Sequence, residues 1–451
     1  MTAAAPANEA AAPPAPAFGE ALRFWLKLGF ISFGGPAGQI AVMHRELVDR
    51  RRWISESRFL HALNYCMLLP GPEAQQLATY LGWLMHRTLG GIVAGVLFVL
   101  PSLLILIALS WVYAAHGQQP LIAAMFWGIK PAITAIVLHA AWRIGSRALG
   151  NGLLWTIALA AFAAIFFLKL PFPAIVAGAA LIGVVGGRLA PTAFRGAGTH
   201  AAGSTAAAED ERCRPEHTRF RWSRLALIGI AGLALWGLPL ALLTAVYGWP
   251  HLLTQLGWFF TKAALLTFGG AYAVLPYVHQ GAVEHYGWLS ATQMIDGLAL
   301  GETTPGPLIM VVAFVGFVAA WNHAVFGADA LFAAGAVAAC VATWFTFLPS
   351  FLFILAGGPL VESTHGRLGF TAPLTAITAA VVGVILNLAL FFAGHVFWPQ
   401  GLAGSVDAGA ALIATAAALA LFRFKRGVIE VIAACAATGV LAGVVSGLLA
   451  G

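Results

Sequence analysis

The chain repeats one stretch of 49 residues at a constant separation of 235 residues. Residues 24–72 align with residues 259–307 without a gap, and 13 of the 49 positions are identical. The identical positions include glycine, proline, histidine and tryptophan, which bare hydrophobicity would not match by chance. An internal duplication therefore constrains this chain more than any other feature, since both halves must be built on one plan.

Two short motifs mark each copy. Phe-Gly-Gly occurs at 33–35 and again at 268–270, and Pro-Gly-Pro follows it at 70–72 and at 305–307. Each motif interrupts an apolar stretch, and glycine and proline are the residues that break helices. Each copy is thus predicted to contain two broken apolar helices.

Composition places these stretches in a membrane. Hydrophobic residues make up 60% of the 451 residues, charged residues 9%, and the mean hydropathy is +0.87. A soluble chain carries about 25% charged residues, and several apolar stretches here reach the roughly 20 residues that cross a bilayer. The predicted fold class is an all-α polytopic membrane protein surrounded by lipid. Basic loops between spans, rather than a nucleic-acid partner, explain the net charge of +7.

The sequence lacks the motifs of cofactor chemistry. It has no P-loop, and no dinucleotide-binding fingerprint opens a βαβ unit. The cysteines form no CxxC pair, and the histidines form no HExxH motif. We therefore expect no bound cofactor, no metal, no catalytic residue and no enzymatic activity.

Five segments follow from the duplication and the composition. Residues 1–20, rich in Ala and Pro, are predicted to form a disordered tail rather than a cleaved signal. The others are an N-terminal repeat at 21–190, a cytoplasmic linker at 191–224, a connecting transmembrane helix at 225–248 and a C-terminal repeat at 249–451. Because one extra helix separates the copies, the second copy is predicted to be inverted relative to the first.

Two membrane topologies fit this order. If every apolar segment crosses, there are 13 spans, but loop 44–58 with five arginines then lies outside and loop 279–290, without Lys or Arg, lies inside. If the four broken segments enter and return on one side, 9 full spans and 4 re-entrant hairpins remain, and every loop obeys the positive-inside rule. We favour the re-entrant topology, and the sequence leaves the other open.

The breaks are the predicted binding site. Inverted repeats with broken helices are the architecture of secondary transporters, whose substrate binds where the breaks meet. A helix that begins at a break points unpaired backbone N–H groups into it, and such helix N-termini bind anions. Kinks and close helix packing are the alternative role of these residues. The candidate substrate-binding residues in the breaks are Gly34, Gly35, Pro36, Pro70, Gly71, Pro72, Gly269, Gly270, Pro305, Gly306 and Pro307.

Three basic residues complete the predicted anion site. Lys27 and Lys262 occupy matched positions about two helical turns before the double glycine. They are candidates for substrate ligands, or for lysines that snorkel to the membrane interface. Arg45 belongs to the arginine-rich loop, which could form a cytoplasmic vestibule that gathers anions or could anchor the topology.

Five ionisable residues are candidates for proton coupling. Glu73 follows the first Pro-Gly-Pro, Glu302 precedes the second, and Asp296 lies further upstream. An acid beside an anion site repels the substrate unless it is protonated, whereas Glu73 can also cap a helix N-terminus. His44 and His279 occupy matched positions, and each is a candidate for a pH-sensitive role or for a hydrogen-bonded hinge residue.

Further stretches join the two motifs into a longer pattern. It runs from Phe-Gly-Gly-Pro at 33–36 through His-Arg-Glu-Leu at 44–47 to Leu-Pro-Gly-Pro-Glu-Ala at 69–74, with a counterpart between 268 and 307. In this pattern the chain resembles the chromate ion transporter family in its long, two-domain form, over nearly its whole length. The resemblance implies a multi-pass inner-membrane carrier that exports chromate and confers chromate resistance.

Other functions stay open at this point. Sulfate and molybdate are alternative oxyanion substrates, by uptake or by exchange, because backbone N–H groups discriminate poorly between tetrahedral dianions. An intramembrane enzyme would need a nucleophile or metal constellation that the sequence lacks, and a channel is a third possibility. The candidate assembly is a homodimer.

Overall fold

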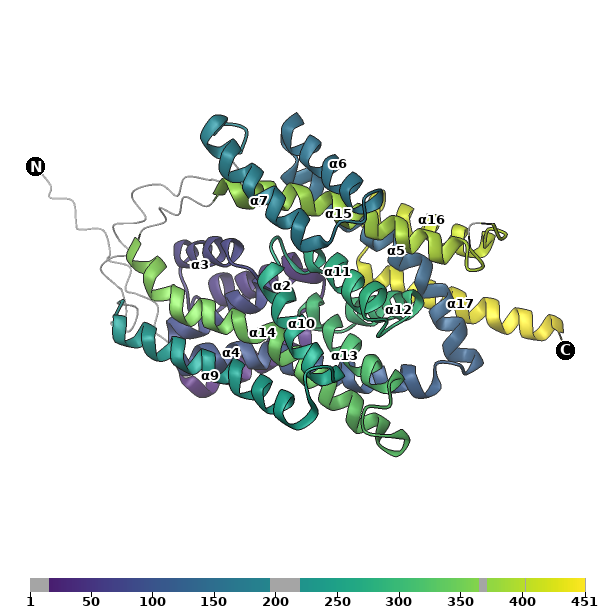
Figure 1. The fold of residues 1–451 in the computed structure, drawn as a ribbon, viewed down its shortest axis with the longest axis horizontal. Helices are drawn as coiled ribbons and strands as arrows, with labels where there is room; N and C mark the ends of the chain where they lie inside the picture. The colour runs from purple at the N-terminus through teal and green to yellow at the C-terminus, as the bar shows by residue number, and fades with distance from the viewer. Residues whose placement is uncertain (1–15, 195–219, 365–370, 402, 451) are drawn as a thin grey trace, which may run out of the picture.

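The fold is helical throughout the part of the chain that the structure describes. In this computed structural model the described residues are 16–194, 220–364, 371–401 and 403–450. Within them no strand occurs (Figure 1), as the predicted fold class requires. Most of the predicted tail and linker lies outside these ranges, although the first helix already begins at Phe18.

The two copies contain corresponding helices in the same order. The first copy comprises α1 (Phe18–Ile31), α2 (Gly35–His44), the π-helix η1 (Arg45–Arg50), α3 (Glu56–Leu68), α4 (Glu73–His116), α5 (Pro120–Ala148), α6 (Gly152–Phe166) and α7 (Phe172–Leu189). The second comprises α10 (Leu252–Leu266), α11 (Ala271–His279), the π-helix η3 (Gln280–His285), α12 (Ala291–Thr303), the 3₁₀ turn η4 (Leu308–Met310), α13 (Val311–Asn322), the 3₁₀ turn η5 (Ala328–Ala330), α14 (Leu331–Thr364), α15 (Thr371–Phe397), α16 (Ala408–Phe422) and α17 (Val428–Ala450). As an exception, α13 and α14 of the second copy correspond to the two limbs of α4, and the second copy adds the 3₁₀ turns η4 and η5. The connecting helix is α9 (Trp222–Tyr247).

Each broken segment of the first copy folds back on itself. The ring of Phe24 in α1 lies 5.5 Å from that of Trp53, which follows η1. The ring of Tyr65 in α3 lies 5.7 Å from that of Tyr80 in α4. A straight helix would separate Tyr65 from Tyr80 by about 22 Å. Both segments are therefore hairpins whose two arms lie side by side.

The second copy folds back in the same way. The rings of Phe259 and Trp288, at positions equivalent to Phe24 and Trp53, lie 5.5 Å apart. The amide of Asn322, at the end of α13, donates a hydrogen bond to the Trp288 carbonyl just before α12, at 3.1 Å. Gly297 in α12 lies against the Phe314 ring in α13. These contacts support the topology with 9 spans and 4 re-entrant hairpins over the topology with 13 spans.

α4 consists of two antiparallel limbs. His86 and Arg87 leave the helical conformation, with φ of −134° and 57°, and beyond them Ala94 lies against Gly82. A continuous helix would separate those two residues by about 18 Å. Within the described residues, 7 helices are long and apolar enough to cross a membrane: α4, α5, α7, α9, α14, α15 and α17. The shorter apolar helices α6 and α16 complete the predicted set of spans.

The long helices of the two copies cross in opposite directions. The second limb of α4 and α14 hold the same place in their copies, and they run antiparallel, with Gly91 against Leu355 and Gly95 against Phe351. Equivalent antiparallel helices are related by a two-fold axis perpendicular to both. For helices that span a membrane this axis lies in the plane of the bilayer, so the second copy is inverted, as predicted.

The two copies also exchange their last helices. α15 of the second copy packs against α6 and α7 of the first, while α5 of the first copy packs against α16 and α17 of the second (Figure 1). Glycines allow close approach, since Gly383 lies against the Ala158 carbonyl and Gly128 against the Cys435 carbonyl. Neither repeat is therefore a packing unit by itself.

Gly128→Leu should destabilise the fold by about 1–3 kcal/mol, because the added side chain would meet the backbone of α17. Gly178→Leu on α7 is the matched control, since nothing lies within 4 Å of an added Cβ there. Size-exclusion chromatography of fluorescent fusions after stepwise heating measures the difference. Identical melting of the two variants would contradict the packing of α5 against α17.

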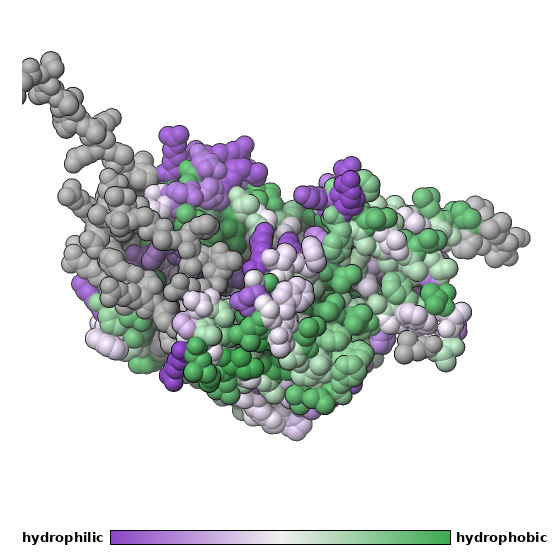
Figure 2. Space-filling model, turned by 90° about the horizontal axis from the view of Figure 1, so that it is seen from above, coloured by the Kyte–Doolittle hydropathy of each residue, from purple (hydrophilic) through white to green (hydrophobic). Residues whose placement is uncertain are grey.

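The surface is suited to lipid. Figure 2 shows a face that is largely apolar, with hydrophilic residues gathered mainly along one edge. α9 is the most exposed of the long helices, and its Leu227, Leu233 and Leu238 are 66%, 69% and 70% exposed. Leucines this open to the surroundings are stable in a bilayer and not in water.

Candidate functional site

The two Pro-Gly-Pro turns interlock across the two copies. The Gly71 amide donates a hydrogen bond to the Thr267 carbonyl at 2.7 Å, and the equivalent Gly306 amide donates to the Ser32 carbonyl at 2.8 Å. Each copy thus supplies the acceptor that the other copy's turn requires. In this conformation both amides are engaged by the protein, so the N–H groups left for an anion are those of the neighbouring helix starts.

A serine from the opposite copy lies against each of these glycines. An added Cβ on Gly71 would lie 2.5 Å from the Ser350 hydroxyl, and one on Gly306 would lie 2.7 Å from the Ser102 side chain. The two serines end a Leu-Pro-Ser motif that α4 and α14 share. Sequence reasoning missed it because its separation is 248 residues instead of 235. The repeated Leu-Pro-Ser motif was nevertheless a signal in the sequence that could have revealed these two serines.

Two buried glutamines fix the turns further. The Gln39 amide donates to the Gly306 carbonyl, and the Gln76 amide donates to the Pro70 carbonyl at 2.7 Å. The Oε1 atoms of both glutamines are buried and have no hydrogen-bond partner. Valine stands at the equivalent position of each glutamine in the second copy, so nothing in the duplication drew attention to them.

Three helices start at the breaks without a side-chain cap. They are α2 after Gly34, α4 after Pro72 and α11 after Gly270. The first-turn N–H groups of an uncapped helix are unsatisfied donors, and they favour an anion. The Glu73 carboxylate already lies near one of them, since an added Cβ on Gly270 would be 3.7 Å from its Oε1. Glu73 thus lies at the N-terminus of a helix from the other copy.

Glu302 lies beside the same helix start. The Tyr272 hydroxyl, in the first turn of α11, donates a hydrogen bond to Glu302 Oε1. The Arg143 guanidinium of α5 is close enough to act on the charge of both groups. Arg143 was not among the predicted site residues, because its position in the sequence indicates only a cytoplasmic helix end. The start of α11 thus lies between two acids, with one cation in reach.

The two Phe-Gly-Gly breaks differ in their exposure. All nine residues of α11 are buried, whereas only Gln39 and Met43 are buried in α2. Phe30 and Phe33, at the first break, are 51% and 37% exposed. The hairpins of the second copy are thus packed within the bundle, and the first break is open on one side.

The matched lysines lie away from the breaks. Lys262 lies over the ring of Trp258 on its own helix, 5.7 Å from the centroid. Lys27 is exposed on α1. Both placements fit the snorkelling interpretation better than the role of a substrate ligand.

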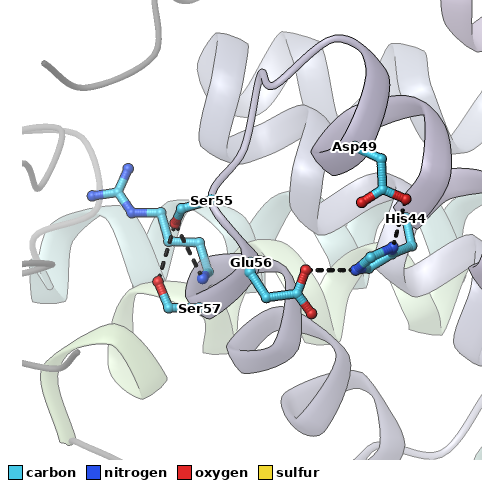
Figure 3. Close-up of polar contacts among 6 residues, drawn as sticks. His44, Asp49, Ser55, Glu56 and Ser57 are labelled. Atoms are coloured by element: carbon cyan, nitrogen blue, oxygen red, sulfur yellow. Dashed lines mark hydrogen bonds and ion pairs between the residues drawn. The ribbon is translucent and has the colours of Figure 1, made fainter. Parts of the chain in front are cut away.

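The matched histidines lie where α2 and α11 widen into π-helices. His44 Nε2 is 2.6 Å from Glu56 Oε2, and its Nδ1 is 3.5 Å from Asp49 Oδ2 (Figure 3). His279 Nδ1 is 3.6 Å from Glu284, the acid equivalent to Asp49. This repeated pairing at a helix junction is the arrangement expected of hinge residues.

The arginine-rich loop is largely occupied with internal pairs. Arg50 pairs with Glu46 at 2.7 Å, and Arg51 pairs with Glu20 at 3.1 Å and lies over aromatic rings of the first hairpin. Arg45 is exposed and remains available to an anion in the vestibule. The internal pairs of Arg50 and Arg51 are compatible with the anchoring role, and the exposure of Arg45 is compatible with the vestibule.

Asp296 does not lie at the breaks. It lies in the middle of α12, where it contacts Lys130 of α5 and Tyr113 of α4. The equivalent position of the first copy holds His61, 3.9 Å from Glu362 of α14.

Together, the helical bundle, the inverted copies and the paired breaks define a polytopic helical membrane protein of the kind that encloses a site between two repeats. The chain belongs to the chromate transporter family, whose model matches residues 19–184 and 254–440. No solved structure matches the chain.

Three relatives cover most of the chain. It is 31% identical to the chromate transport protein of Cupriavidus metallidurans, over 89% of this chain and 87% of that protein. It is 34% identical to the chromate transport protein of Pseudomonas aeruginosa, over 84% and 82%. It is 30% identical to a probable chromate transport protein of Synechococcus elongatus, over 82% and 84%.

Proposed function

We propose that this protein is a secondary active transporter that exports chromate from the cytoplasm across the inner membrane and so confers chromate resistance. The observation that supports it most is the reciprocal pairing of the four breaks, in which Gly71 pairs with Thr267 and Gly306 pairs with Ser32. Two inverted copies that complete each other's broken helices form one site that either side of the membrane can reach in turn. We propose chromate as the substrate because two of the relatives are chromate transport proteins.

The proposed binding position is the start of α11, where Glu73 lies. A carboxylate at an uncapped helix N-terminus occupies the place of an anionic substrate. Arg143 supplies a positive charge that acts on the neighbouring Glu302. An arriving oxyanion replaces the Glu73 carboxylate, which moves away or takes up a proton. The other breaks hold this helix start in position.

Alternating access follows from the difference in exposure between the two Phe-Gly-Gly breaks. In the conformation described, α11 is buried and the first break is exposed. The first break adjoins the arginine-rich loop, which the positive-inside rule places in the cytoplasm. We propose that this conformation is the inward-facing one and that the outward-facing one exchanges the environments of the two hairpin pairs.

The membrane potential is sufficient to drive export. With an inside-negative membrane, each negative charge that leaves gains roughly 2.3 kcal/mol per 100 mV. A dianion gains about twice that amount, which corresponds to a gradient of more than 1,000-fold. Uptake or exchange of sulfate or molybdate is the alternative, because the same helix starts would bind those ions.

Chromate accumulation in everted membrane vesicles tests the proposal. We expect accumulation that requires a membrane potential and that falls when excess sulfate competes. Vesicles without the protein are the control, and the protein is shown to be folded by chromatography. If energised vesicles accumulate no more chromate than the control, export is wrong, and right-side-out vesicles then test uptake.

A further inference from the structure

A buried ion pair lies in the bundle apart from the breaks. Asp296 is 3% exposed, its Oδ2 is 3.5 Å from Lys130 Nζ, and the Tyr113 hydroxyl donates a hydrogen bond to the same oxygen at 2.9 Å. The other carboxylate oxygen, Oδ1, is buried and has no hydrogen-bond partner. Two helices of the first copy and one of the second therefore meet at this pair.

Stability alone does not account for this pair. Burying two charges costs several kcal/mol per ion, and their attraction offsets that cost only when the remaining polar atoms are also satisfied. Oδ1 is not satisfied. An ionisable residue inside a membrane bundle is by default a functional residue. The pair is therefore expected to be separated during the working cycle.

Lys130 is open on one side. Its side chain is 27% exposed, compared with 3% for Asp296, so a second anion can approach the ammonium group while the carboxylate stays buried. Asp296 precedes Thr304 by eight residues, or about 12 Å along α12. The pair is thus close to the second Pro-Gly-Pro turn without belonging to it.

Few charged groups surround Asp296. The groups that act on it are the Lys130 ammonium from α5 and the Tyr113 hydroxyl from α4. Among the other helices packed against α12, η4 and α13 contain no ionisable side chain, and α15 contains His395 in its last turn. α17 contains Glu430 in its first turn and Cys435. Lys130 is therefore the cation that balances Asp296.

We propose that Lys130 is a binding cation for the transported oxyanion, and that Asp296 is its resident counter-ion, which the oxyanion replaces when the carboxyl group takes up a proton. This inference rests on the proposed function. The carboxylate gains one proton and becomes a neutral acid that can donate a hydrogen bond, while Lys130 keeps its charge. Each bound dianion then moves with one proton and transfers one net negative charge, which halves the electrical driving force that an uncoupled dianion would have.

Sulfate binding to the purified full-length protein tests this inference. Sulfate is the probe for pH dependence because it stays a dianion from pH 6 to 8, whereas chromate takes up a proton itself. Calorimetry should show that affinity rises as the pH falls, by up to about tenfold per pH unit, the limit for one linked proton. Asp296→Asn should bind at all pH values as tightly as the wild type does at low pH.

The other variants separate charge from structure. Lys130→Met should weaken sulfate binding more than tenfold at every pH, and Lys130→Arg should restore most of it. Glu362→Gln is the matched control, because it neutralises an acid of α14 that lies 3.9 Å from His61, the first-copy counterpart of Asp296, and it should keep the wild-type pH slope. The double variant Lys130→Met/Asp296→Asn removes both charges together, so it should fold and lose both affinity and pH slope.

Two results would overturn the inference in different ways. If the wild type binds oxyanions but Asp296→Asn keeps the full pH slope, or Lys130→Met keeps full affinity, then this inference alone is wrong. If the wild type binds neither sulfate nor chromate at any pH from 6 to 8, the proposed function is wrong, and this inference is wrong with it.

Discussion

Gly71→Leu is expected to lower oxyanion transport at least ~30-fold while the protein remains in the membrane. Gly71 has a φ of 128°, which side chains rarely adopt, and an added Cβ would lie 2.5 Å from both Ser350 and Gln76. Backbone strain of about 1–2 kcal/mol and overpacking of about 1–3 kcal/mol together correspond to that factor. The equivalent change Gly306→Leu should have the same effect, because φ there is 104° and Ser102 lies equally close.

Gly229→Leu on α9 is the control for both variants. Nothing lies within 4 Å of an added Cβ at this position, so the variant should transport like the wild type. Chromate accumulation in everted vesicles, normalised to the amount of protein, measures all three. Wild-type rates in Gly71→Leu would show that the interlocked turns are not part of the transport pathway.

Arg143→Ala is expected to raise the apparent KM for chromate about 10–100-fold. The guanidinium is the cation that acts on Glu302 and Tyr272 beside the start of α11. A hydrogen bond to a charged group contributes about 1.5–3 kcal/mol, which corresponds to this range. Arg143→Lys should keep part of the effect, because it keeps the charge and loses the planar fork of donors.

The control for Arg143 lies one helical turn further along α5. Arg147 is exposed in the last turn of the helix, so Arg147→Ala changes the charge of the same face without touching the site. Its KM should stay within about twofold of the wild type, because charges exposed to solvent are screened. An equal rise of KM in both variants would indicate a general effect of surface charge rather than a ligand.

Much of the fold could be predicted because local chemistry determines it. Glycine and proline in close succession disrupt a helix, so the two motifs indicated the positions of all four breaks. Five arginines in loop 44–58 favoured the re-entrant hairpins, which the contacts of Phe24 with Trp53 and of Phe259 with Trp288 support. The positions of the breaks and the re-entrant topology could therefore be inferred without knowing which helices pack against each other.

Contacts between the copies could not be predicted in the same way. The bond from Gly71 to Thr267 joins residues 196 positions apart, and a backbone amide leaves no trace in a sequence. The serines of the Leu-Pro-Ser motif escaped because the second copy has an extra loop, including η5, between α13 and α14, where the first has only a tight turn at Arg87. That insertion changes the separation from 235 to 248 residues.

The charged residues of the site were predicted only in part. Glu73 and Glu302 were recognisable because they adjoin Pro-Gly-Pro motifs. Lys130 and Arg143 lie on an apolar helix without a motif, and their acidic partners are supplied by the other copy. The matched lysines, Lys27 and Lys262, drew attention through the duplication, yet they lie towards the membrane surroundings.

α9 makes few contacts, yet the two copies can assemble only when this helix is present between them. Its length and hydropathy are what a membrane-inserting machinery reads, and few of its side chains are buried. An unrelated apolar helix of the same length should therefore serve in its place. Without α9 the second copy would insert into the membrane in the opposite orientation. The Thr267 carbonyl would then be out of reach of the Gly71 amide. The least buried long helix thus sets the orientation of the second copy by adding one membrane crossing. Its sequence can vary as long as the helix still spans the membrane.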